Sequence, residues 1–202
     1  MKRAIVALGG VALAGLVALS LPALAVHSNQ SDPNDTSGRL DVRSVAFAHD
    51  SGPPTWRFLT FSNWSIHEIW DAGYFIVELD TRGGPEIDHL LVARSDGSRL
   101  LATLYRIRND GKQVAMGSIA TSKTGSRRAS VSVALHKLTI GQLRTSYFWA
   151  ALTSLSGSAC SRPCIDRIPD EGMVEQPLPG VTPSPTPTPS PSPTESPSPS
   201  PT

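Results

Sequence analysis

The sequence predicts an all-β domain, an antiparallel β-sandwich of the jelly-roll type with about eight strands. Two observations lead to this prediction. No long segment shows the apolar period of a helix, and short runs of alternating apolar and polar residues recur along the chain with turn-forming residues between them. A small barrel is the alternative, because its strands alternate in the same way.

The first strands are expected before residue 81. Residues 40–48 alternate but change phase at Ser44, which predicts a β-bulge. Residues 55–61 are apolar on both faces, and residues 62–73 read as a short helix or long loop that crosses between the sheets. Residues 73–80 alternate regularly. The expected core face of this strand consists of Phe75, Val77 and Leu79.

Turn signals divide the rest of the domain. They stand at 81–85, 95–98 and 109–111, where Gly, Pro, Asn and Asp gather. The remaining strands are expected at 87–94, 99–106, 113–120, 128–135 and 145–154, with a single helical turn at 136–138.

Both ends of the chain differ from this domain. Residues 1–25 read as a signal peptide: a basic start, an uncharged apolar run and the small-x-small pattern Ala23-Leu24-Ala25. An uncleaved membrane anchor is the alternative, because the run is near the lower length limit for a membrane span. Residues 179–202, rich in Pro, Ser and Thr, predict a disordered linker or tail. We therefore expect a secreted or cell-surface domain at 26–178, with no transmembrane helix after signal cleavage.

The domain is electrically neutral. Removing Lys2, Arg3 and Glu195 from the totals leaves 16 basic and 16 acidic residues. Without a basic excess, the composition does not favour nucleic-acid binding. Its two cysteines, Cys160 and Cys164, are expected to form a disulfide in an oxidising exterior, with free thiols as the alternative. A single pair of cysteines is too few for a typical zinc site.

Four segments carry a resemblance to a known family. They are DPNDTSGRLDVR (32–43), IVELDTRGGPEIDHLLV (76–92), VSVALHKL (131–138) and CIDRIPDEG (164–172). In these segments the chain resembles a family of secreted bacterial β-sandwich domains, which is similar in outline to DOMON-like domains and family 9 carbohydrate-binding modules. The resemblance implies a sandwich fold and, by remote analogy, ligand binding.

Acidic residues gather at both ends of the domain. Because domain termini often lie close together, these groups are candidates for one site of oxygen ligands, which suits calcium. Ordinary turn chemistry is one alternative. Ion pairing with Arg39, Arg43 or Arg167 is another. The candidate ligands are Asp32, Asn34, Asp35, Asp41, Asp166 and Asp170.

A second candidate site lies in the segment 62–73. Exposed indole rings stack on sugar rings in many binding modules, and nearby polar groups bond the hydroxyls. The alternative is a loop that fills the core, since large aromatic side chains are buried more often than exposed. The candidate ligand-binding residues are Trp64, Trp70, Asn63 and Asp71.

These features predict an exported, non-catalytic binding module, for carbohydrate or another cell-wall or cell-surface polymer. A structural or adhesive surface domain that contacts proteins is the alternative. A hydrolase using Glu78 or Asp80 is a remote alternative, because the chain contains no nucleophile, metalloprotease or phosphate-loop motif.

Overall fold

The computed structural model describes residues 26–50, 52–84, 86–141, 144–157 and 160–178. The signal-peptide and tail predictions lie outside these residues. Within them, no helix is both long enough and apolar enough to cross a bilayer.

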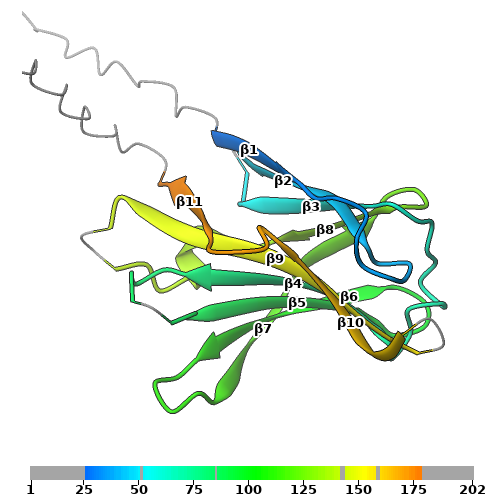
Figure 1. Ribbon diagram of the computed structural model, residues 1–202. Coiled ribbons are helices and arrows are strands. Elements are labelled where there is room, and N and C mark those ends of the chain that lie inside the picture. The colour runs from blue at the N-terminus through cyan, green and yellow to red at the C-terminus, as the bar shows by residue number, and fades with distance from the viewer. Residues whose placement is uncertain (1–25, 51, 85, 142–143, 158–159, 179–202) are drawn as a thin grey trace, which may run out of the picture.

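The described residues form an all-β fold, as predicted. Eleven antiparallel strands join in one sheet, which curls into a half-barrel (Figure 1). Their order is β1-β2-β3-β8-β7-β6-β5-β4-β9-β10, and β11 also pairs with β9. The strands are β1 (Val26–Ser31), β2 (Val42–His49), β3 (Thr55–Thr60), β4 (Gly73–Asp80), β5 (His89–Ser95), β6 (Leu100–Ile107), β7 (Gln113–Lys123), β8 (Arg128–Ser132), β9 (Ser146–Gly157), β10 (Cys160–Ile168) and β11 (Val174–Pro177).

The sheet is continuous because β7 belongs to both of its halves. Residues 113–119 pair with β6, and residues 120–123 pair with β8. A bulge divides the first of these pairings: Ala115 lies opposite Tyr105 and Gly117 opposite Leu104, so Met116 is the extra residue. The strands of both halves therefore follow one hydrogen-bonded path.

All eight predicted strands are present, and β4 has the predicted bounds. The predicted bulge lies between Val42 and Ser44, and the predicted helical turn is a 3-10 turn at Leu135–Lys137. Of the two expectations for the segment before β4, the loop is confirmed, because residues 62–72 contain bends, turns and an isolated bridge and no helix. Three strands were not predicted, β1, β10 and β11, because their short polar sequences lack a regular alternation.

Aromatic side chains hold the two halves of the curled sheet together. Trp149 on β9 stacks on Phe47 of β2, with ring centroids 6.3 Å apart, and meets Trp56 of β3 edge-on at 6.4 Å. Phe58 on β3 packs in the same way on Phe75 of β4, at 5.2 Å. The predicted core face of β4 is fully buried. The first and last thirds of the domain therefore share one core.

Candidate metal centre

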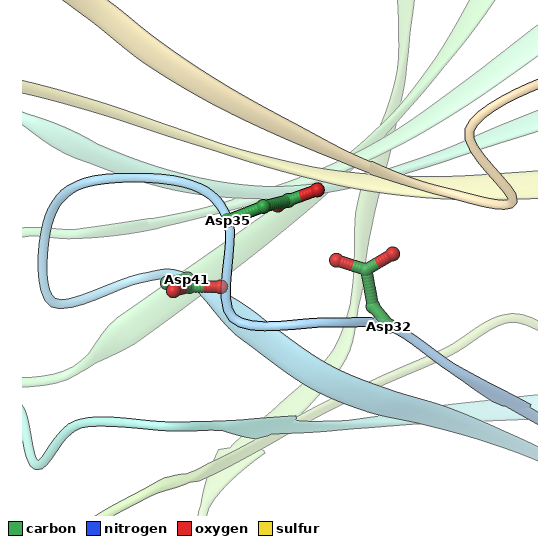
Figure 2. Close-up of side chains that lie close together, drawn as sticks. All are labelled: Asp32, Asp35 and Asp41. Atoms are coloured by element: carbon green, nitrogen blue, oxygen red, sulfur yellow. The ribbon is translucent and has the colours of Figure 1, made fainter.

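Three carboxylates meet on the loop between β1 and β2. Asp32, Asp35 and Asp41 each offer an oxygen, and these oxygens lie within 4.8 Å of one another (Figure 2). Calcium binds oxygen at roughly 2.4 Å, so two ligands on opposite sides of one ion are about 4.8 Å apart. A single ion can therefore contact all three residues.

A fourth carboxylate comes from the other end of the domain. Asp166 on β10 is buried, and its Oδ2 accepts a hydrogen bond of 2.5 Å from the backbone N–H of Val42. The loop is also tied to β9, because Thr153 donates its hydroxyl to the carbonyl of Leu40 at 2.6 Å. The two acidic ends of the domain thus converge, as the sequence analysis expected.

Within the described residues, no basic side chain pairs with these carboxylates. Asp41 is only 2% exposed, and its Oδ1 has no hydrogen-bond partner. The buried Oδ2 of Asp32 also has none. Of the arginines considered for ion pairing, Arg39 pairs with Glu68 at 3.0 Å and Arg167 with Glu78 at 3.4 Å, and Arg43 forms no ion pair within the described residues. Buried, unpaired carboxylate oxygens are costly, and a bound cation removes that cost.

The pKa values of the clustered carboxyls are raised, so these groups favour the protonated, neutral form. Burial, followed by the charge of Asp166, raises the pKa of Asp41 to about 6. The same two causes raise the pKa of Asp32. Burial raises the pKa of Asp166 as well, although the hydrogen bond from Val42 acts in the opposite direction. Without a cation these groups hold protons that exposed carboxyls would release.

The two remaining predicted ligands, Asn34 and Asp170, are exposed beside the carboxylate cluster. Asn34 is exposed and, with Asp35 and Asp41, lines a hollow of about 420 Å³. Asp170 is also exposed, and its charge helps to raise the pKa of Asp32. The structure therefore brings Asp32, Asp35, Asp41 and Asp166 together, with Asn34 and Asp170 beside them.

The predicted ligand-binding residues of segment 62–73 divide into two groups. Trp64 is 3% exposed and packs on Phe75 at 5.1 Å, so its position gives no support to sugar stacking. Trp70 is 56% exposed and stacks on His67 at 6.1 Å. Asn63 and Asp71 are exposed as well.

Fluorescence quenching distinguishes these tryptophans. Trp70 is the exposed one of the four tryptophans, and the other three are buried. We therefore expect Trp70→Phe to remove most of the emission that acrylamide quenches. Trp64→Phe is expected to leave that quenchable fraction in place. The reverse result would contradict the placement of both side chains.

The predicted disulfide is only partly visible. Cys164 is not a free thiol. The side chain of Cys160 lies outside the described residues. The Cys160–Cys164 bridge therefore stays a prediction.

The chain has no match among models of known protein families, among curated proteins or among solved structures. Its function must therefore be inferred from its own geometry and chemistry.

Proposed function

We propose that the chain is an exported, non-catalytic binding module whose jelly-roll sandwich is closed by a structural calcium ion. The observation that carries this proposal is the carboxylate cluster, in which buried oxygens of Asp41 and Asp32 accept no hydrogen bond and their nearest polar neighbour is a further carboxyl, Asp166. All its candidate ligands are oxygen atoms, the kind that calcium prefers to the nitrogen and sulfur of zinc sites. The cluster joins the loop at 32–41 to β10, so the ion acts as a clip between the two ends of the domain.

The carboxylates outside the cluster support a non-catalytic role. Glu78, a candidate acid of the hydrolase alternative, pairs with Arg167. Asp80 accepts the backbone N–H groups of Arg82 and Gly83, at 3.0 and 2.5 Å. Each therefore has a structural partner in the fold. Carbohydrate is the proposed ligand class because Trp70 is exposed, as a sugar-stacking ring must be, and because the resemblance expected from the sequence is to ligand-binding modules.

Calcium titration tests the metal half of the proposal. We expect calorimetry on protein freed of divalent ions to show one calcium site. Asp41→Asn removes one ligand charge at nearly constant volume and is expected to weaken binding by about tenfold or more. Asp110→Asn, which removes an exposed carboxylate on the β6–β7 hairpin, is the matched control and should bind as the unaltered protein does. The absence of calcium binding, or equal affinity in Asp41→Asn, would overturn the proposed site.

A pull-down assay tests the binding half. Calcium-loaded protein is incubated with insoluble cellulose, chitin, xylan and peptidoglycan, and retention on at least one is expected. Loss of retention on all four would overturn the binding module and favour the structural or adhesive domain.

A further inference from the structure

A second cluster of charge lies on the hairpin ends, and it is basic. Arg82 follows β4, Arg106 lies in β6, and Arg108 begins the β6–β7 hairpin. The three line a pocket of about 390 Å³ together with Ile107, Asn109 and Asp110. The backbone N–H of Ile107 donates to the carbonyl of Asp88 at 2.7 Å, which fixes the end of β6 against the start of β5. Arg82 and Arg106 are therefore carried by ordered backbone.

The nearby carboxylates satisfy two of these arginines only in part. Asp88 Oδ2 already accepts the backbone N–H groups of Thr81 and Arg82, each at 2.9 Å, and the Nε of Arg82 reaches the other oxygen at 3.4 Å. Arg108 meets Asp110 at 3.8 Å, and both side chains are exposed, so this pair is weak.

Arg106 is the least satisfied of the three. It is half-buried, and within the described residues its side chain forms no hydrogen bond or ion pair, although its backbone lies in the ladders with β5 and β7. A guanidinium group carries five donors in a planar fork, which matches the two oxygens of a carboxylate or phosphate. Asp88 and Asp110 offset the charges of Arg82 and Arg108, so the unpaired guanidinium of Arg106 is the group that an entering anion would meet.

We propose that this pocket binds the anionic group, carboxylate or phosphate, of an acidic glycan. The choice of a glycan rests on the proposed function, which it deepens by naming the charge of the ligand. The volume of the pocket is in the range of small-ligand sites, and Asn109, which lines it with the arginines, carries an amide that can bond hydroxyls. A nucleic acid is not favoured, because it needs a row of phosphate contacts and the domain as a whole has no basic excess.

Titration with short soluble glycans tests this pocket. In calcium buffer, the protein is titrated with an oligogalacturonate, with a glycerol-phosphate oligomer from teichoic acid, and with a neutral xylo-oligosaccharide. We expect binding to at least one acidic glycan, weakened by salt, and none to the neutral one. Comparing the oligogalacturonate with the glycerol-phosphate oligomer shows whether the pocket binds a carboxylate or a phosphate.

Substitutions locate the binding. Arg106→Gln is expected to weaken it by about tenfold or more, and Arg106→Lys, which keeps the charge but loses the fork, by less. Arg57→Gln removes the same charge from the exposed side of β3 and should change nothing. Arg108→Gln changes an exposed side chain and provides a second test if Arg106→Gln fails to fold.

The outcomes separate this inference from the proposed function. Acidic glycan binding that survives both Arg106→Gln and Arg108→Gln would overturn the pocket. The same result is expected if the glycan binds to the proposed calcium ion instead of to the arginines. Binding of the neutral glycan alone would overturn the pocket and leave the binding module intact. Failure to bind any soluble glycan would overturn the pocket alone if the protein is retained on a polysaccharide in the pull-down. Failure in both assays would overturn both proposals.

Discussion

Calcium added in about hundredfold excess over its dissociation constant is expected to raise the melting temperature by about 6–12 °C near neutral pH. At that excess the ion stabilises the folded state by about 3 kcal/mol, and for a domain of this size each kcal/mol shifts the melting temperature by roughly 2–4 °C. The measurement is a thermal melt followed by circular dichroism, on protein freed of divalent ions and on the same protein with calcium. An unchanged melting temperature would rule out a structural calcium.

The shift is expected to shrink in acid. Without calcium, the folded protein holds a proton on Asp41 up to about pH 6, whereas the unfolded chain releases it near pH 4. In this window the folded state binds more protons than the unfolded state, so the calcium-free protein loses stability as pH rises. Calcium displaces these protons and binds more tightly as pH rises. The calcium-induced rise in melting temperature should therefore be smaller at about pH 5 than at about pH 7.5. An equal rise at both would contradict a pKa of Asp41 that is higher in the folded state than in the unfolded state.

Trp149→Ala is expected to lower the free energy of unfolding by about 3–5 kcal/mol, because it leaves a large cavity in the core. Trp149 is fully buried and contacts both Phe47 and Trp56, so its removal separates β9 from β2 and β3. Urea unfolding followed by far-ultraviolet circular dichroism measures the loss without relying on tryptophan emission.

Trp70→Ala is the matched control for this change. It removes the same side chain from the surface, where a substitution typically costs about 0.5 kcal/mol or less. Equal losses in the two variants would show that the aromatic cluster does not join the halves of the sheet.

The strands with an apolar stripe were predictable from the sequence. In β4, the buried Phe75, Val77 and Leu79 alternate with half-buried positions, and a period of two residues is typical of a strand. The edge strand β10 was missed because its sequence contains Pro163 and no continuous apolar stripe. The course of β7 from one half of the sheet to the other was equally hidden, because it depends on long-range pairing and the bulge at Met116.

The candidate metal centre was predictable and the arginine pocket was not. Aspartates crowd both termini of the domain in the sequence, and Asp41 and Asp166 meet because the curled sheet brings those termini together. Arg82, Arg106 and Arg108 resemble the ordinary solvated ends of strands and turns. Only the fold shows that they surround one pocket and that Asp88 is already occupied by backbone N–H groups.

The hydrogen bond from Val42 to Asp166 also bears on how the chain folds. It joins residues 124 positions apart, so the loop that must close before it forms spans most of the domain. Contacts of such long sequence separation slow folding, because the entropy of closure is lost before the contact contributes. A chain emerging from its N-terminus cannot complete the cluster until β10 has followed. The carboxylate cluster is therefore assembled only after nearly the whole domain has folded, so an ion that needs all four carboxylates binds the folded domain and not its partly folded forms.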